Sequence, residues 1–344
     1  METRILELEF FASHRDLARD AASLLKAGEV VALPTETVYG LAADAFNPAA
    51  VAKIFAVKGR PAHDPLIVHV TGRGMLDGVA IVPPEIEDAF RKITEEFWPG
   101  ALTIVLPKGP RIPDCVTSGL PTVAVRAPAH AVMRSILKEL GNPLAAPSAN
   151  RFGRISPTTA GAVLAELGGR IPLLIDGGAC RDGLESTIIR ITATEKKPLI
   201  EILRAGPITK DMLKPFGKVK VANKPKSSAA APEVPGQLES HYAPQTPLLT
   251  PATPAEFLPE AGKRYGLLSY RGDAADGFLT LTDWAATETL SPGSGKIAEA
   301  GVRFFAMLRR LDDLNLDAIV AEPLPDHGVG LALQERLRRA SHRG

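Results

Sequence analysis

The chain has 344 residues, more than the roughly 100 to 200 residues of one typical domain, so we expect two domains. Hydrophobic residues make up 45% of the sequence, which is enough to bury a core. The 40 basic and 39 acidic side chains leave a formal net charge of +1, which excludes the broad basic surface of a dedicated nucleic-acid-binding protein and restricts any RNA contact to a local patch.

The first predicted element is a helix between an N-cap pattern at Ser13 and Asp16 and a stop at Gly28. Further helices are expected over 48–57, 84–97, 129–140, 157–167 and 208–217. Ser156 is placed to cap the helix that begins at Pro157.

Short apolar runs between these helices predict strands. They are expected over 30–33, 66–70, 101–106, 122–126, 143–146, 172–176, 186–192 and 199–203. The last three follow one another without room for crossover helices, so they must pair partly antiparallel. The pattern therefore predicts an α/β domain with a mixed sheet.

The composition changes after the helix at 208–217. Residues 219–232 are rich in Lys, Pro, Ser and Ala, which is typical of a linker. The rest of the chain predicts a small α/β unit with a long helix over 295–314 and strands near 264–270 and 317–321. We therefore expect a first domain over 1–214, a linker or lid over 215–246, and a small C-terminal α/β domain over 247–344.

Two short polar signatures stand out in predicted loops, Lys58-Gly59-Arg60-Pro61 and Ser148-Ala149-Asn150. The planar guanidinium of arginine matches phosphate oxygens and lysine adds a compact charge, so the Lys-x-Arg pair is typical of a polyphosphate site. Surface Lys and Arg are common, however, and a pair of solvated cations remains the alternative.

Other blocks accompany these signatures in a fixed order. They are residues 34–41, 64–70, 97–100, 123–128 and 146–150. With these blocks the sequence resembles the threonylcarbamoyl-AMP synthase family, the YrdC-like enzymes, in its long two-domain form. The resemblance is strong over residues 1 to about 210 and looser beyond. It implies a YrdC-like mixed twisted sheet domain, followed by a linker and a smaller Rossmann-like α/β domain.

The resemblance implies that L-threonine, bicarbonate or CO2, and ATP condense to threonylcarbamoyl-AMP and pyrophosphate, for threonylcarbamoyladenosine modification of tRNA. It also implies Mg²⁺ accompanying ATP, a tRNA-modifying transferase as partner, and at most a weak tRNA contact. The carbamate is unstable in water, so the site must exclude solvent. Attack on the α-phosphate brings two anions together, so fixed cations are needed, for which we nominate Lys58, Arg60 and Arg204.

The family motifs assign individual residues by position. Catalytic roles are implied for Lys58, Arg60, Ser148 and Asn150. Contacts to ATP are implied for Lys58, Arg60, Asp64, Thr122, Ser148, Ser156, Arg204, His241 and Tyr242. Contacts to threonine are implied for Thr35, Thr37, His69, Arg126, Ala146 and Ser186. No protein ligand to a metal is predicted.

Several of these residues have structural alternatives. Arg126 ends an apolar strand, where its charge needs either the threonine carboxylate or an acidic residue of the chain. A lone histidine such as His69 is often a core residue. The segment containing His241 and Tyr242 is interpreted as a lid over the nucleotide or as an attachment to the first domain. We expect Arg60 to be an exposed loop cation that contributes little to stability.

Asp64 departs from the family pattern, which usually has asparagine before this Pro-Leu pair. A carboxylate near ATP repels phosphate unless it binds a metal or a ribose hydroxyl. Residues 151–154 also depart from the usual Pro-Ser-Gly turn.

Two other functions remain open. A carbamoyl-transfer module of hydrogenase maturation shares the first domain, but it expects zinc-finger cysteines, and this chain has only Cys115 and Cys180. A non-catalytic RNA-binding protein is suggested by the basic linker and by Arg336, Arg338 and Arg339. Because no stretch reaches the ~18 apolar residues of a membrane span, we expect a soluble cytoplasmic protein without membrane contact.

Overall fold

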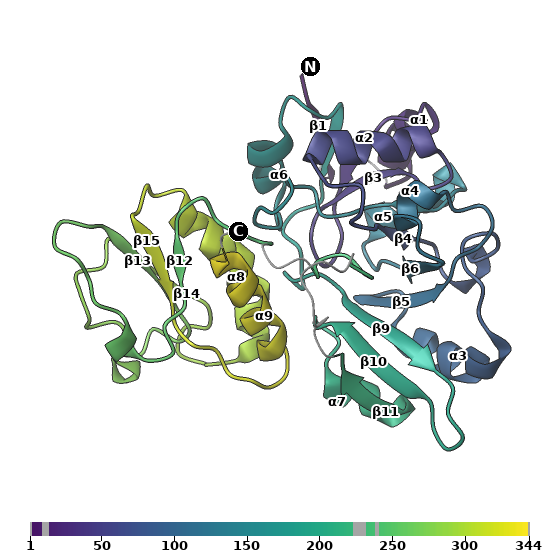
Figure 1. Ribbon diagram of the computed structural model, residues 1–344. Coiled ribbons are helices and arrows are strands. Elements are labelled where there is room, and N and C mark those ends of the chain that lie inside the picture. The colour runs from purple at the N-terminus through teal and green to yellow at the C-terminus, as the bar shows by residue number, and fades with distance from the viewer. Residues whose placement is uncertain (1, 9–13, 223–231, 238–240, 343–344) are drawn as a thin grey trace. The chain divides into compact units, whose positions relative to one another are not determined.

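The computed structural model describes residues 2–8, 14–222, 232–237 and 241–342. The chain divides into two compact units: the first contains residues up to Phe152 together with Pro157–Gln237, and the second contains Gly153–Ser156 and the chain from Leu238 onward. Each unit has its own sheet (Figure 1) and its own hydrophobic core. Among the described residues, none of the helices combines the length and the apolar character that crossing a membrane requires.

The described part of the first unit builds one eleven-stranded sheet in the order β1-β8-β2-β3-β7-β4-β6-β5-β9-β10-β11. Its strands are β1 (Arg4–Glu7), β2 (Val31–Leu33), β3 (Gly40–Asp44), β4 (Ile67–His69), β5 (Leu102–Pro107), β6 (Thr122–Arg126), β7 (Leu144–Ala145), β8 (Leu173–Asp176), β9 (Thr187–Thr192), β10 (Leu199–Arg204) and β11 (Lys218–Val221). Neighbours β4 and β6 are parallel, whereas β5 and β6 are antiparallel, which confirms the predicted mixed sheet.

The three closely spaced strands at the end of the first unit pair only in part as expected. β9 and β10 are antiparallel neighbours, which confirms the prediction. β8 instead lies between β1 and β2, far from β9 in the strand order. β1, β3 and β11 were not predicted from the sequence, and two of them, β1 and β11, are the edges of the sheet.

The helices of the first unit are α1 (His14–Lys26), α2 (Pro48–Lys58), α3 (Glu87–Phe97), α4 (Asp114–Thr117), α5 (Ala131–Leu140), α6 (Ala160–Leu167) and α7 (Lys210–Leu213). α2 begins where the side chain of Asn47 accepts hydrogen bonds from two backbone N–H groups, and it ends at Gly59, which has a left-handed φ of 64°. This left-handed end turns the chain directly from Lys58 toward Arg60.

Two helix predictions need correction, and one cannot be compared. α6 is capped by Thr159, whose side chain accepts from the N–H of Ala162, and not by Ser156. The helix expected over 208–217 is reduced to α7 and a 3-10 turn over Lys214–Phe216, because Pro215 cannot continue the α-helical hydrogen bonding. The predicted cap at Ser13 lies outside the described residues.

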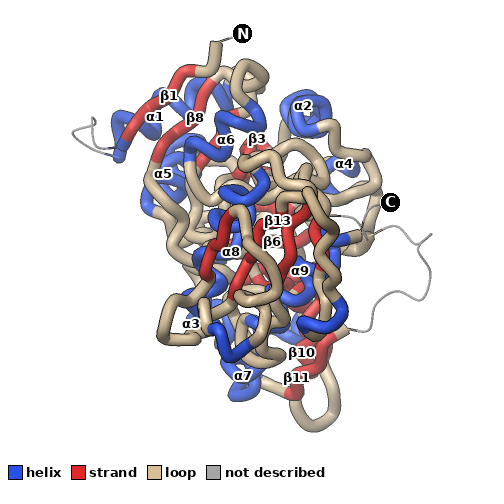
Figure 2. Tube along the Cα trace, turned by 90° about the vertical axis from the view of Figure 1, so that its left-hand side faces the viewer, coloured by secondary structure: helices blue, strands red, loops and turns tan. Residues whose placement is uncertain are grey.

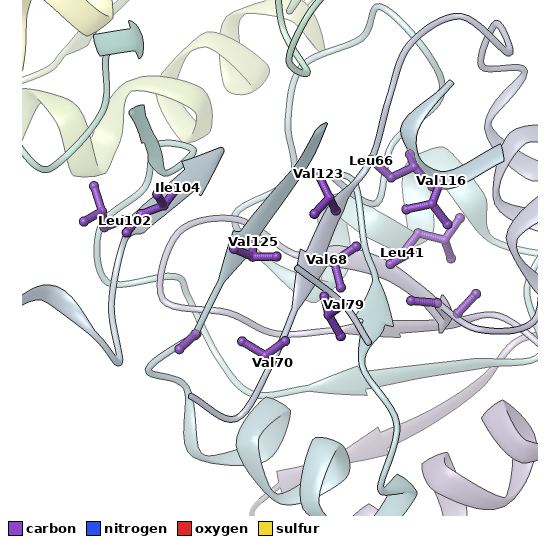
Figure 3. Packing of buried hydrophobic residues seen from close by; sticks show 14 of the residues in the cluster. Leu41, Leu66, Val68, Val70, Val79, Leu102, Ile104, Val116, Val123 and Val125 are labelled. Carbon is purple, nitrogen blue, oxygen red and sulfur yellow. The ribbon is translucent and has the colours of Figure 1, made fainter. Parts of the chain in front are cut away.

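Helices pack against both faces of the first sheet. Helices α1 and α5 lie side by side on one face (Figure 2). There Leu17 and Ile136 belong to one buried cluster with Val31. The other face packs against α2, α3 and α6 and carries the larger cluster, which includes Leu41, Val68 and Val125 (Figure 3). Alternation of side chains along each strand separates the two clusters.

In strands β4, β6, β5 and β9, the same alternation points a second set of side chains to the face opposite the large cluster. Ile67, Val105, Ala124 and Ile188 form a small buried cluster of their own. It is covered by Val234, which belongs to the described segment 232–237. This face of the sheet holds much of the candidate site.

The described second unit contains a four-stranded sheet in the order β12-β15-β13-β14, with all neighbouring strands parallel. The strands are β12 (Leu248–Leu249), β13 (Tyr265–Ser269), β14 (Ala286–Thr289) and β15 (Ala318–Ala321), and the helices are α8 (Ile297–Asp312) and α9 (Gly330–Ser341). α8 packs against β13, β14 and α9, and α9 also packs against β12 (Figure 1). This arrangement confirms the small α/β unit expected for the C-terminal part of the chain.

The units differ from the boundaries expected from composition. Residues 218–221 were assigned to the linker, but they form β11 and pair with β10 in the first sheet. Val234 belongs to the first unit, whereas Gly153–Ser156, from the middle of the predicted first domain, belong to the second. Composition could not show this, because these assignments depend on contacts between residues far apart in the sequence. Residues 223–231, also within the predicted linker, lie outside the described residues.

Candidate active site

A row of polar side chains crosses three neighbouring strands of the first sheet. The strand register pairs His69 of β4 with Arg126 of β6, and Arg126 with Thr103 of β5. All three residues are buried. His69 and Arg126 were predicted as site residues, whereas Thr103 was not. The position of Thr103 between the core residues Leu102 and Ile104 indicates that it faces the opposite side of the sheet.

Arg126 is held by several groups. Its Nη2 lies 2.7 Å from Oε1 of Glu36, its Nη1 donates to Oγ1 of Thr37 at 2.9 Å, and its Nε donates to the carbonyl of Gly100 at 3.1 Å. Burial alone would raise the pKa of Glu36, but the guanidinium of Arg126 beside it lowers that pKa below its usual value. The acidic partner weighed as an alternative for Arg126 is therefore present, and contact with threonine stays a prediction.

The segment before β3 supplies two predicted threonine contacts, Thr35 and Thr37. Their hydroxyls lie 2.8 Å apart, and Thr35 donates to the carbonyl of Val38 at 2.6 Å. Thr35 also accepts the N–H of Thr37 at 3.1 Å, as expected for a local hydroxyl turn. The turn fixes the hydroxyl of Thr37, which accepts from Arg126, next to that of Thr35.

His69 is a neutral imidazole in this environment. Burial, and then the charge of Arg126, lower its pKa to about 3. Its Nδ1 has no hydrogen-bond partner among the described residues. His69 therefore offers an uncharged polar atom rather than a cation at neutral pH.

Ser186 joins the row of polar residues to a second arginine. Its hydroxyl is 2.7 Å from Oγ1 of Thr103 and accepts from Nη2 of Arg204 at 3.2 Å. Arg204 also donates to the carbonyls of Ser186, at 2.9 Å, and of Pro235, at 3.2 Å. Ser186, a predicted threonine contact, and Arg204, a predicted ATP contact, are thus connected by hydrogen bonds to Thr103, the cross-strand neighbour of Arg126.

Lys58 organises the Ser148-Asn150 signature. Its buried ammonium donates to the backbone carbonyls of Ser148 and Asn150, each at 2.5 Å. Its own carbonyl accepts the N–H of Phe152 at 2.8 Å. Burial, and then the charge of Arg60, hold the pKa of Lys58 well below its usual value. The two polar signatures therefore form one structural element, although they lie about 90 residues apart.

Arg60 is not the exposed loop cation that we expected. Its side chain is 3% exposed and lies 2.9 Å, from Nη2 to Oδ2, from the carboxylate of Asp64, which is completely buried. Nε and Nη2 also donate to the carbonyls of Asp64, at 3.1 Å, and Pro65, at 2.8 Å. The expectation was wrong because the partner of Arg60 is the buried carboxylate of Asp64, four residues later in the chain. The guanidinium therefore points into the protein and not into solvent.

The remaining predicted residues are divided between the units. Thr122 begins β6 and Ala146 follows β7 in the first unit. Ser156, His241 and Tyr242 belong to the second unit. In it, the rings of His241 and Tyr242 have centroids 4.1 Å apart, and Arg336 lies over the Tyr242 ring at 5.5 Å. The two roles predicted for the His241-Tyr242 segment, a lid or an attachment, both stay predictions.

The electrostatic character of the first-unit site is unusual. Lys58, Arg60, Arg126 and Arg204 are all buried. Within the described part of the chain, no group of three or more His, Cys, Asp or Glu side chains is placed to hold a metal ion. Each of these cations has carbonyl or carboxylate partners within the chain, and the concentration of positive charge suits this part of the protein to an anionic ligand.

Comparison with known proteins relates this chain to a family. A model described as "Telomere recombination" matches residues 23–206, and one described as "Threonylcarbamoyl-AMP synthase, C-terminal domain" matches residues 208–342. The chain is 39% identical to a threonylcarbamoyl-AMP synthase of Bacillus subtilis, over 93% of this chain and 92% of that protein. It is 37% identical to one of Pyrococcus abyssi, over 94% and 93%.

A solved structure supports the same relationship. The crystal structure of P. abyssi Sua5 complexed with L-threonine matches with a TM-score of 0.86 and 35% identity, over 98% of each chain. The similarity covers both units and is not limited to the segments that carry the motifs. By sequence and by fold, this chain belongs to the threonylcarbamoyl-AMP synthase family.

Proposed function

We propose that this protein is an L-threonylcarbamoyladenylate synthase, a nucleotidyltransferase that condenses L-threonine, bicarbonate or CO2, and ATP. The observation that carries the proposal is the burial of Lys58, Arg60, Arg126 and Arg204 in one unit, with Arg204 linked to the Arg126 row through Ser186 and Thr103. Substrates that bring a carboxylate, a carbamate and a triphosphate together need such a set of fixed cations.

The threonine half of the site is assigned to the row that crosses β4, β6 and β5. The related Sua5 structure holds L-threonine. In this chain Arg126 offers a guanidinium to the substrate carboxylate, while Thr35, Thr37 and Ser186 offer hydroxyls to its polar groups. Neutral His69 and the apolar Ala146 add a surface for the side chain of threonine without adding charge.

The nucleotide half is assigned to Lys58, Arg60 and Arg204, with Ser148 and Asn150 held around Lys58. Thr122 and Asp64 lie in the same unit. Mg²⁺ would accompany ATP and offset part of the negative charge of its phosphates.

The reaction joins two steps. The neutral amine of threonine attacks CO2 and loses a proton, which gives a carbamate. A carbamate oxygen then attacks the α-phosphorus of ATP, the bond from that phosphorus to the bridging oxygen breaks, and pyrophosphate leaves. Arg126 holds the amino acid, and Lys58, Arg60 and Arg204 reduce the repulsion between the two anions and stabilise the departing pyrophosphate.

The product defines the partners. Threonylcarbamoyl-AMP hydrolyses readily, so a transferase must receive it and pass the threonylcarbamoyl group to an adenosine of tRNA. The net charge of +1 is consistent with no more than a weak direct contact with tRNA. We assign the protein to the cytoplasm, where ATP, threonine and tRNA occur together.

The decisive experiment supplies purified protein with threonine, bicarbonate, ATP and Mg²⁺ and measures both pyrophosphate and the mass of the nucleotide product. Pyrophosphate release should require threonine and bicarbonate, and the product should have the mass of threonylcarbamoyl-AMP. Equal release without threonine would remove the substrate assignment. Release with bicarbonate and a different carbamoyl product would instead favour the carbamoyl-transfer alternative.

A further inference from the structure

The carboxylate of Asp64 is buried in an unusual way. Its side chain is fully enclosed, and Nη2 of Arg60 lies 2.9 Å from Oδ2. Neither carboxylate oxygen accepts a geometrically sound hydrogen bond from any described residue. Arg60 directs hydrogens of Nε and Nη2 to the carbonyls of Asp64 and Pro65 instead. Buried carboxylates normally accept hydrogen bonds. Because Asp64 does not, its negative charge is balanced mainly by the positive charge of its neighbours.

Those neighbours include the cations that we assign to the triphosphate. Burial raises the pKa of Asp64, and Arg60, Lys58, His63 and Arg204, in that order, oppose the rise. Lys58 and Arg60 lie at the end of α2 and in the loop after it, His63 is an exposed residue of that loop, and Arg204 ends β10. Asp64 is thus an anion placed among the positive charges of the nucleotide half.

We propose that the Asp64 carboxylate is a resident counter-ion of the triphosphate site, which balances Arg60 and Lys58 before ATP binds and takes up one proton when phosphate oxygens engage these cations. The inference rests on the proposed function. The proton comes from solvent and joins a carboxylate oxygen, and no other bond is made or broken. Protonation converts an acceptor that repels phosphate into an O–H donor.

The reason is electrostatic. Two anions that share the same cations in a poorly solvated site repel each other strongly, and the anion with the higher pKa is neutralised at the lower cost. Burial has already moved Asp64 in that direction. An asparagine at this position would be neutral at every pH, so aspartate makes ATP binding depend on proton concentration.

The test is titration calorimetry with α,β-methylene-ATP and Mg²⁺, because this analogue cannot lose pyrophosphate. Measurements in buffers of different ionisation enthalpy give the number of protons taken up on binding. The wild-type protein should take up as much as about one proton more than Asp64→Asn. Above the pKa of Asp64 in the nucleotide-free site, wild-type affinity should fall by as much as about tenfold per pH unit relative to Asp64→Asn, because ATP's own protonation is common to both.

Asp44→Asn is the matched control. Asp44 is another buried carboxylate, but it accepts hydrogen bonds from the N–H of Phe46 at 2.9 Å and from Asn142 at 2.8 Å. Its variant should take up as many protons as the wild type. Equal proton uptake by the wild type and Asp64→Asn would overturn the inference. So would a loss of Mg²⁺-dependent binding in Asp64→Asn, which would identify Asp64 as a metal ligand.

A measurement on the wild type covers the case in which Asp64→Asn does not fold. Infrared difference spectra with and without the analogue should show the band of a newly protonated carboxyl group when nucleotide binds. Binding without that band would reject the inference while leaving the proposed function intact. Failure of the wild-type protein to bind the analogue at all would instead count against the proposed function.

Discussion

Arg126 and Glu36 form an ion pair of 2.7 Å, from Nη2 to Oε1, in which both side chains are 4% exposed. Glu36 belongs to the segment between β2 and β3, and Arg126 ends β6. The pair therefore ties the segment with the predicted threonine contacts to the middle of the sheet. A buried pair of this kind adds little net stability compared with apolar residues, but the loss of one partner leaves an uncompensated charge.

Arg126→Ala should lower the free energy of unfolding by about 3–5 kcal/mol, because Glu36 would remain buried without its guanidinium. Arg91→Ala is the control, since Arg91 forms solvent-exposed ion pairs with Asp88 and Glu95 and its loss should change stability little. Denaturant titration measures both variants. Similar losses in the two would show that the buried pair has no structural role.

The contribution of Glu36 should disappear in acid. Although burial opposes it, Arg126 lowers the pKa of Glu36 below the usual 4.5, so the folded protein binds this proton less readily than the unfolded chain. The carboxylate then stabilises the fold above about pH 4.5, and this stabilisation is lost as the pH falls through the lowered pKa. The difference in unfolding free energy between the wild type and Glu36→Gln should shrink below that pH. A difference that grows in acid would contradict the assignment.

Arg60 should be needed for stability as well as for synthesis. Arg60→Gln leaves the Asp64 carboxylate buried beside a neutral group, and a loss of about 3–5 kcal/mol is expected. Adding Asp64→Asn removes the orphaned charge, so the double variant should regain much of the stability while synthesis stays low. Thermal unfolding and pyrophosphate release measure the two properties. Additive losses of stability in the double variant would argue against a coupled pair.

Lys58→Met should abolish most synthesis, because it removes a cation proposed to contact phosphate and the donor that gathers the carbonyls of Ser148 and Asn150. A decrease in kcat of about 10²-fold or more is expected from the loss of one preorganised donor. Lys53→Met on the same helix is the control, since Lys53 forms a solvent-exposed ion pair with Glu29 at 2.7 Å, from Nζ to Oε1. Equal kcat values in the two variants would remove Lys58 from the site.

Val234→Asp should reduce synthesis through the segment 232–237. Val234 is fully buried against Ile67, Ala124 and Ile188, and the carbonyl of the next residue, Pro235, accepts from Arg204. A carboxylate at position 234 should displace the segment and release that contact of Arg204. Val221→Asp is the control, because Val221 is 50% exposed on the edge strand β11. Steady-state kinetics should show a loss only for Val234→Asp.

Local patterns in the sequence predicted the fold class and many of the elements. β6 was predicted with its observed ends, and α2 differs from its prediction by one residue. The α/β class follows from alternating helical and strand periodicity, which is a property of neighbouring residues. The residues named for the site also carry motifs that can be read along the chain. Lys58, Ser148 and Asn150 were expected in one site, and they are in contact.

Tertiary structure alone decided which groups balance these charges. The partner of Arg126 is Glu36, the link between Arg126 and Ser186 is Thr103, and Arg60 is buried with Asp64 instead of facing solvent. Likewise, β1 and β11 form strands by pairing with β8 and β10 at the two edges of the sheet. Sequence by itself determines which segments are apolar, polar or charged. Pairing, burial and pKa depend on groups that the chain brings together from distant positions, and no local pattern encodes those distances.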